Sequence, residues 1–154
     1  MTKFYAGVGN RKAPHEILDL IKVYATVMRL KDYTLRSGGA IGPDKHFQHY
    51  AGLKKEIIWA LESHRYPAWY EMAERYHGGW HNCDEDARRF LARNCAIVLG
   101  YDLATPVEFV IAWTPGGAVT GGTGHTIRIA RAHDIPVYNL ASRADCAELE
   151  ERIF

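Results

Sequence analysis

The stretch Glu108-Phe109-Val110-Ile111-Ala112-Trp113 is the most strand-like segment of the sequence. It is almost continuously apolar, which is typical of a parallel strand with both faces covered by helices. A glycine-rich segment follows at 115–124, and a helix is predicted from there to His133. A buried strand followed by a glycine-rich loop and a helix indicates an α/β fold.

Four further strands are predicted on either side of this one, with helices between them, at 4–8, 33–36, 56–61 and 136–140. Two helices are expected with both ends marked, from Pro43 to Gly52 and from Asp84 to Gly100. Two more are expected to begin at Pro14 and after Ser142. The segment 62–83 is less clear and contains one candidate helix, at 67–76. Parallel strands joined by helices pair through right-handed crossovers. We therefore predict a doubly wound sheet of about five strands in the order 3-2-1-4-5, with helices on both faces. Because 154 residues suit one domain and no linker is visible, residues 1–154 are expected to form a single domain.

The charge balance is close to neutral: 19 Lys and Arg against 18 Asp and Glu give a formal net charge of +1. Sequence-independent binding to nucleic acid normally relies on an excess of cations, so nucleic acid is not expected as a partner. No apolar run approaches the ~20 residues of a membrane span, so no membrane partner is expected. Three cysteines without close spacing, and no signal sequence before Lys3, favour a cytoplasmic protein with reduced thiols.

Glycine gathers at three places, each directly after a predicted strand. The carboxyl ends of parallel strands meet at one edge of a sheet, and open α/β sheets bind ligands where the strand order reverses. Backbone N–H groups approach a phosphate most closely where no side chain intervenes. The residues expected to contact such a ligand are Gly7, Gly9, Ser37, Gly38, Gly39, Gly121, Gly122, Thr123 and Gly124.

Two familiar nucleotide motifs are absent. The dinucleotide pattern GxGxxG would need glycine where Lys12 stands, and Ser37 with its following glycines replaces the acidic residue that would hold a ribose. The P-loop pattern GxxxxGK[ST] does not occur either. A hydride-transferring dehydrogenase and a P-loop ATPase are therefore not expected, and no resident cofactor is predicted.

The glycine motifs, taken in order, resemble the DprA/LOG-like (SLOG) Rossmann superfamily over roughly residues 3–140. They are Gly7-x-Gly9-x-Arg11, Ser37-Gly38-Gly39-Ala40-x-Gly42-x-Asp44 and Gly121-Gly122-Thr123-Gly124. More narrowly, Arg93-Asn94, Val98-Leu99-Gly100 and Trp113-Thr114-Pro115 look like those of small members common in bacteriophages and bacteria. The resemblance implies binding of a nucleotide or a nucleotide-derived ligand.

The resemblance has two branches with different implied functions. The LOG branch hydrolyses nucleoside monophosphates, but its pattern PGGxGTxxE would place the catalytic glutamate at Arg128 and its threonine at His125. The LOG chemistry therefore does not transfer residue for residue. The DprA branch binds single-stranded DNA, which a net charge of +1 without a basic stripe does not favour.

Five side chains are candidates for the remaining contacts. Arg11 fits either a bidentate phosphate contact or a solvated position. Asp44 fits a ribose contact or a general base, or else a cap of the helix after it. Asn10 fits a base or sugar contact or a turn, and His125 fits a phosphate donor or a partly exposed helix start. Trp113 fits stacking on a base or core packing. The catalytic candidates are Asp44, Asn10 and His125.

Other polar clusters are given plainer interpretations. His77, His81 and Cys83 have no evident fourth ligand, so no metal site is expected. The arginines of the helix after Asp84 are interpreted as a solvated face: Arg88, Arg89 and Arg93. The middle segment is rich in aromatic residues: Trp69, Tyr70, Tyr76 and Trp80. These rings are not all expected to reach one small core, and exposed aromatic rings are typical of interfaces. The segment therefore predicts a homo-oligomer.

The sequence thus predicts a nucleotide or nucleotide-sugar ligand in the crevice, with hydrolysis of the N-glycosidic bond of a nucleoside monophosphate as the reaction to test. The alternatives are a non-catalytic protein that sequesters a nucleotide signal and a DprA-like protein that binds single-stranded DNA.

Overall fold

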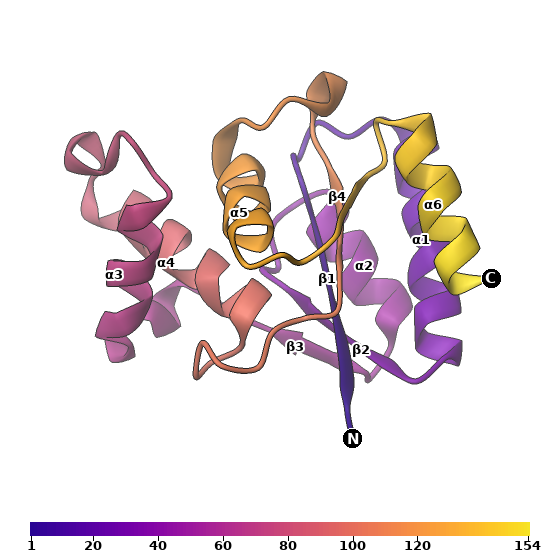
Figure 1. The fold of residues 1–154 in the computed structure, drawn as a ribbon, viewed down its shortest axis with the longest axis horizontal. Helices are drawn as coiled ribbons and strands as arrows, with labels where there is room; N and C mark the ends of the chain where they lie inside the picture. Colours follow the sequence, from indigo (N-terminus) through magenta and orange to yellow (C-terminus); the bar gives the residue numbers. More distant parts are fainter.

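The computed structural model describes residues 1–154 and contains one parallel sheet of five strands (Figure 1). The strands are β1 (Lys3–Gly9), β2 (Tyr33–Ser37), β3 (Lys55–Ile57), β4 (Val110–Trp113) and β5 (Val137–Asn139). Their order is β3-β2-β1-β4-β5, which confirms the predicted topology. The central strand is β1, where Ala6 pairs with Arg36 of β2 on one side and with Val110 of β4 on the other.

Six α-helices cover the two faces of the sheet: α1 (His15–Leu30), α2 (Pro43–Ala51), α3 (Pro67–Arg75), α4 (Glu85–Leu99), α5 (Gly121–Ala132) and α6 (Arg143–Ile153). In Figure 1, α1, α2 and α6 lie on one side of the strands, and α3, α4 and α5 lie on the other. None of these helices has the length and hydrophobicity needed to cross a membrane.

Both faces of the sheet are buried, so the chain has two cores. Successive side chains of a strand point to opposite faces. Accordingly, Val110 and Ala112 pack in the core under α3, α4 and α5, whereas Ile111 and Trp113 pack in the core under α1, α2 and α6. This double burial explains why the sequence of β4 is continuously apolar.

The predicted third strand is shorter than expected. The ladder with β2 ends at Ile57, and the N–H of Ile58 still donates to the carbonyl of Ser37 at 2.9 Å. The chain then turns into a 3₁₀ segment, Ala60–Arg65, because the Glu62 carboxylate accepts the N–H of Trp59 at 2.9 Å. The prediction of a strand from 56 to 61 is therefore wrong beyond Ile57.

The aromatic middle segment is largely buried within the chain. Trp69 is 1% exposed and Trp80 is 7% exposed, and Tyr70 and Tyr76 pack against the same core. The expectation that these rings could not all reach the core is wrong, because α3 adds a layer outside α4 that the sequence did not make clear. The argument for a homo-oligomer that rested on these four rings is thereby removed.

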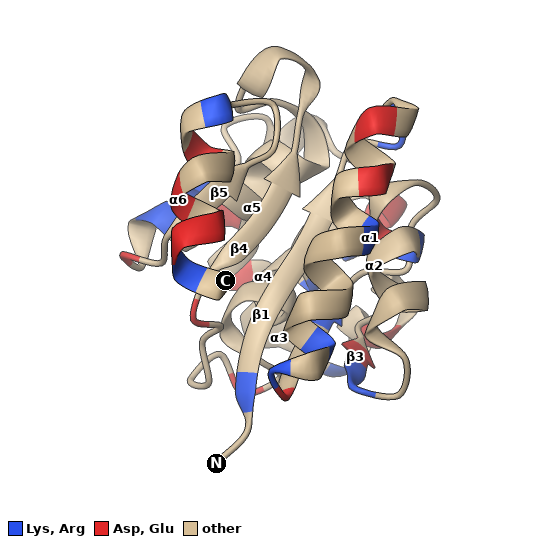
Figure 2. Ribbon diagram, turned by 90° about the vertical axis from the view of Figure 1, so that its right-hand side faces the viewer, with Lys and Arg blue, Asp and Glu red and all other residues tan.

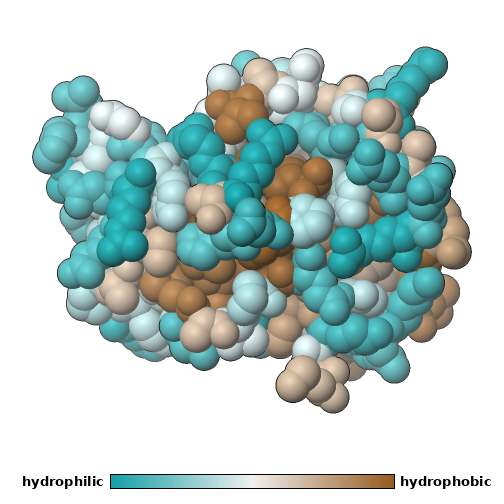
Figure 3. Space-filling view, viewed as in Figure 1, coloured by the Kyte–Doolittle hydropathy of each residue, from teal (hydrophilic) through white to brown (hydrophobic).

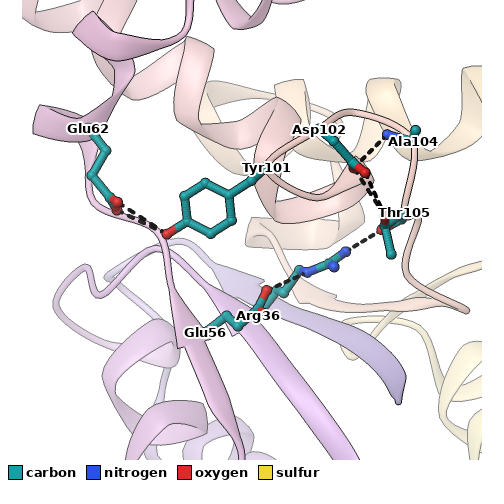
Figure 4. A network of polar contacts seen from close by, with 7 residues as sticks. All are labelled: Arg36, Glu56, Glu62, Tyr101, Asp102, Ala104 and Thr105. Atoms are coloured by element: carbon teal, nitrogen blue, oxygen red, sulfur yellow. Dashed lines mark hydrogen bonds and ion pairs between the residues drawn. The ribbon is translucent and has the colours of Figure 1, made fainter. Parts of the chain in front are cut away.

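A polar network ties the strands to the loop that follows α4 (Figure 4). Arg36 is buried under the ring of Phe4, and its Nε donates to Glu56 of β3 at 3.0 Å. Its Nη1 donates to the carbonyl of Thr105. In the same region the Tyr101 hydroxyl donates to the Glu62 carboxylate at 3.2 Å. The network therefore fixes the 3₁₀ segment and the loop before β4 against the sheet.

Gly7 of β1 lies against the buried ring of Phe47 in α2. A Cβ at Gly7 would be 2.5 Å from Phe47 Cγ, which is too close for any carbon contact. We expect Gly7→Ala to lower the free energy of unfolding by about 1–3 kcal/mol, as overpacking in a buried core does. The matched control is Gly78→Ala, where a Cβ meets nothing within 4 Å. Urea unfolding of both variants tests this, and equal midpoints would contradict the close packing of α2 on β1.

Candidate functional site

A cavity of about 520 Å³ opens at the carboxyl end of β1, beside the amino end of α5. Its wall combines the end of β1, the loop before α2, the inner side of α4 and the start of α5. Because β1 and β4 are neighbours whose following helices lie on opposite faces, this is the switch point of the sheet. Cavities of 300–1,000 Å³ are typical of small-ligand sites.

The structure places half of the sequence-predicted site residues in the wall of this cavity. Those lining it are Gly9, Asn10, Arg11, Asp44, Gly121, Gly122 and Thr123. Those that do not line it are Gly7, Ser37, Gly38, Gly39, Trp113, Gly124 and His125. The second set supports the wall: the hydroxyl of Ser37, for example, donates to the carbonyl of Gly7 at 2.6 Å. Trp113 is 9% exposed and packs in the core under α1, α2 and α6.

Asp44 holds the loops after β1 and β2 together. Its Oδ1 accepts the N–H of Gly9 at 3.2 Å, and its Oδ2 accepts those of Gly38 at 3.2 Å and Ala40 at 3.4 Å. Asp44 is 5% exposed, and its burial raises the pKa of its carboxyl from 3.8 to about 6, although the charge of Arg93 and the three N–H groups act in the opposite direction. Both carboxylate oxygens are thus engaged by the backbone, and α2 has no side-chain cap.

Arg93 is buried in the wall of the cavity, so its interpretation as part of a solvated face is wrong. It is 7% exposed, and its Nη1 donates to the carbonyls of Gly38 at 2.6 Å and Ile58 at 3.2 Å. Its Nε is buried without a partner, and Nη2 donates to no protein atom. The sequence did contain an indication of this burial, because Arg93 and Asn94 interrupt an otherwise apolar, helical run. Polar residues within such a run are either buried with the apolar ones or point into a cavity.

His125 connects three helices below the cavity. Its Nε2 donates to the carbonyl of Ala73 in α3 at 3.0 Å, and its Nδ1 accepts from Asn94 Nδ2 at 3.3 Å. The ring is fully buried, and this burial lowers the pKa of His125 to about 4. Asn94 also donates to the carbonyl of Gly122, at 3.2 Å. His125 is therefore a neutral ring that positions the start of α5.

The cavity wall is rich in hydrogen-bond donors and poor in acids. The first turn of α5 presents the N–H groups of Gly121, Gly122 and Thr123, which have no acceptor within the helix. Arg11, Arg93 and Arg128 line the cavity without forming an ion pair. Asp44 is the one carboxylate of the wall, and its negative charge is disfavoured by burial. This arrangement suits an anion such as a phosphate.

The apolar part of the wall includes two exposed side chains. Phe90 of α4 is 53% exposed, and the Arg93 guanidinium lies 5.3 Å from the centre of its ring. Ile41, in the loop before α2, is 70% exposed. Exposed apolar atoms also appear between hydrophilic ones on the face drawn in Figure 3. Next to donors for a phosphate, an exposed aromatic ring and an aliphatic side chain suit a flat base.

The opposite pKa shifts of Asp44 and His125 predict opposite pH dependences. For Asp44 the folded state holds a proton more tightly than the unfolded state, so its contribution to stability falls as pH rises through about 6, by about 3 kcal/mol in total. For His125 the folded state holds a proton less tightly, so stability is gained as pH rises from about 4 to 6.5. The two effects offset each other in the unmodified chain.

Single variants separate the two effects. Relative to the unmodified chain, Asp44→Asn is expected to become more stable as pH rises from about 4 to 6, and His125→Gln is expected to become less stable over the same range. Urea unfolding between these pH values measures both differences. Parallel pH profiles for the two variants would contradict the assigned burial of these groups.

Fold and cavity together define a class: a Rossmann-like α/β domain with an arginine-lined pocket at the switch point of its sheet. No family model matches the sequence, and no curated protein matches it. Among solved structures, the chain is similar to DNA processing protein A from Helicobacter pylori, studied for its single-stranded DNA binding mode. The two share 19% identity with a TM-score of 0.64 over 99% of this chain and 73% of that one. This likeness shows that the two chains share a fold.

The likeness corrects one sequence-based expectation. We expected no nucleic-acid partner, but the protein with the same fold binds single-stranded DNA. The expectation failed because it rested on the net charge of the whole chain. Figure 2 shows positive and negative residues interspersed over the helices, so their sum is near zero. That sum does not reveal that three arginines without ion pairs gather at one cavity.

Proposed function

We propose that this protein binds single-stranded DNA and that the switch-point cavity holds one nucleotide unit of the strand. The observation that carries the proposal is the composition of the cavity wall. Three unpaired arginines and a helix amino end lie beside an exposed aromatic ring, and the wall has a single, buried acid. The binding of single-stranded DNA by a protein of the same fold supports this choice of ligand.

In this proposal the phosphate lies at the start of α5. The N–H groups of Gly122 and Thr123 donate to its oxygens, and Arg128 approaches it from two turns along the same helix. Arg128 is held in position because its Nε donates to the carbonyl of Tyr76 at 2.9 Å, which leaves its terminal nitrogens for the ligand. Arg11 approaches from the loop after β1. The base lies against the apolar wall at Phe90.

A free nucleotide is the second candidate. The cavity volume of about 520 Å³ is typical of a small-ligand site, and a single nucleotide can occupy it without being part of a strand. Hydrolysis of a nucleoside monophosphate would need a carboxylate and a proton donor that are free to act. Asp44 already accepts three backbone N–H groups, and His125 is neutral and held between two partners. As the second candidate we therefore propose a protein that binds a free nucleotide without hydrolysing it.

The test is a pair of titrations followed by calorimetry, one with an oligothymidylate of about ten nucleotides and one with thymidine 5′-monophosphate. We expect saturable binding of both, and at least ~10-fold tighter binding of the oligonucleotide because it adds contacts beyond the cavity. Equal affinities would favour the free nucleotide as ligand. No heat with either would overturn the proposed function. Chromatography of the recovered monophosphate, with free thymine as the marker, reports hydrolysis.

A further inference from the structure

Trp59 is the one tryptophan of this chain with a largely exposed side chain. It is 49% exposed, whereas Trp69, Trp80 and Trp113 are at most 9% exposed. It does not line the cavity, and the proposed function above does not use it. Tryptophan supplies a large flat surface for contact with a ligand, so its position relative to the cavity is of interest.

The backbone of Trp59 is held rigidly. Its N–H donates to the Glu62 carboxylate at 2.9 Å, and its carbonyl accepts the N–H of Glu62 at 3.0 Å. The same carboxylate accepts the hydroxyl of Tyr101, which follows α4 (Figure 4). The turn that carries the ring is therefore held by hydrogen bonds, so little backbone entropy is lost when the ring contacts a ligand.

The ring of Trp59 lies on the turn that forms one edge of the cavity. A Cβ added to Gly39, whose φ is +71°, would be 2.4 Å from Trp59 Cζ3. A Cβ added to Gly38 would instead be 2.2 Å from Arg93 Nη1, inside the cavity wall. Trp59 and Arg93 thus lie on the two sides of one glycine pair, and Arg93 also binds the carbonyl of Ile58. The exposed ring is next to the cavity, beyond its rim.

We infer that Trp59 is a stacking platform for the base of the nucleotide adjacent to the one held in the cavity. The inference rests on the proposed function. An aromatic ring next to a cationic site is the combination that binds successive bases of a single strand, because every base has a flat face and every linkage has a charge. The ring and the cavity then form two neighbouring subsites, separated by Gly38 and Gly39. Two adjacent subsites give the protein a higher affinity for a strand than for a single nucleotide.

The experiment compares the unmodified chain with Trp59→Ala, Trp59→Phe and Leu53→Ala. Leu53 is 98% exposed and precedes β3, at the opposite end of the sheet from the cavity. We expect Trp59→Ala to weaken binding of the oligothymidylate ~10-fold or more, Trp59→Phe to restore most of the affinity, and Leu53→Ala to change nothing. Affinity for thymidine 5′-monophosphate should stay within ~2-fold in all variants, because that ligand occupies only the cavity.

Fluorescence supplies a second measurement on the same samples. The oligonucleotide should quench the tryptophan emission of the unmodified chain, and this quenching should disappear in Trp59→Phe although that variant still binds. Unchanged oligonucleotide affinity in Trp59→Ala would overturn the inference while leaving the proposed function standing. An equal loss for the monophosphate would also overturn it, since the substitution would then be acting through the cavity. Absence of binding by the unmodified chain would overturn both proposals.

Discussion

Gly122→Asp is expected to remove DNA binding without harming the fold. A Cβ at Gly122 meets nothing within 4 Å, and its φ is not in the left-handed region, so the side chain is accommodated. A carboxylate in the first turn of α5 interacts favourably with the helix dipole and should raise the free energy of unfolding by about 0.3–1 kcal/mol. The same carboxylate occupies the place proposed for the phosphate and repels it, so affinity should fall ~100-fold or more.

The control for this prediction is Gly122→Asn, which has the same shape without the charge. It should bind with a loss of less than ~10-fold, since only steric competition remains. Calorimetric titration gives the affinities, and urea unfolding gives the stabilities. In Gly122→Asp the affinity is expected to fall while the free energy of unfolding rises. A loss of binding caused by unfolding would instead lower both quantities. Normal binding by Gly122→Asp would exclude the start of α5 as the phosphate site.

Arg93→Met is expected to cause the largest loss of stability among the cavity residues. The guanidinium satisfies the carbonyls of Gly38 and Ile58 and faces the buried Asp44. Removing the guanidinium leaves these two buried carbonyls without their donor, which typically costs about 1–3 kcal/mol for each unsatisfied group. The pKa of Asp44 should rise further above 6, since the opposing charge of Arg93 is lost. Oligonucleotide affinity should fall as well.

Two controls make this prediction specific. Arg89→Met lies one turn earlier on α4 and removes only ion pairs to Glu85 and Asp86 near the surface, so it should change stability by less than about 1 kcal/mol. The loss caused by Arg93→Met should be smaller in an Asp44→Asn background, because the uncompensated carboxylate is then absent. Urea unfolding of the four variants measures both differences. Additive losses would show that Arg93 and Asp44 act independently.

The order of the strands followed from local signals. Several helix ends of the structure coincide with these signals. Helices begin at prolines or after the capping residues Asp84 and Ser142, and two helices end at Gly52 and Gly100. Each of these signals acts within a few residues, and right-handed crossovers then leave few topologies. The edge strand β3 was overextended for the same reason. The run Ile57 to Leu61 reads as a strand, but a contact from Glu62 turns the chain.

The candidate site was predictable where it depends on backbone and less so where it depends on burial. Gly9, Asn10, Arg11, Asp44 and the start of α5 reached the cavity because strand ends converge at the switch point. The burial of Arg93 and His125 depends on helix α3 packing outside α4 and α5, which no local pattern encodes. A charged residue within an apolar helical run, as at Arg93, is the signal to look for.

The central claim is that a few unpaired arginines bind the phosphates of a single strand. The most direct test is the affinity for the ten-nucleotide oligothymidylate at salt concentrations from about 50 to 500 mM. One phosphate in the cavity and one in the linkage to the neighbouring nucleotide predict that log K falls linearly with log salt, with a slope of about −1.4. The slope should move toward zero by about 0.7 in Arg128→Ala. Binding that is independent of salt, or no binding at the lowest salt, would contradict the account.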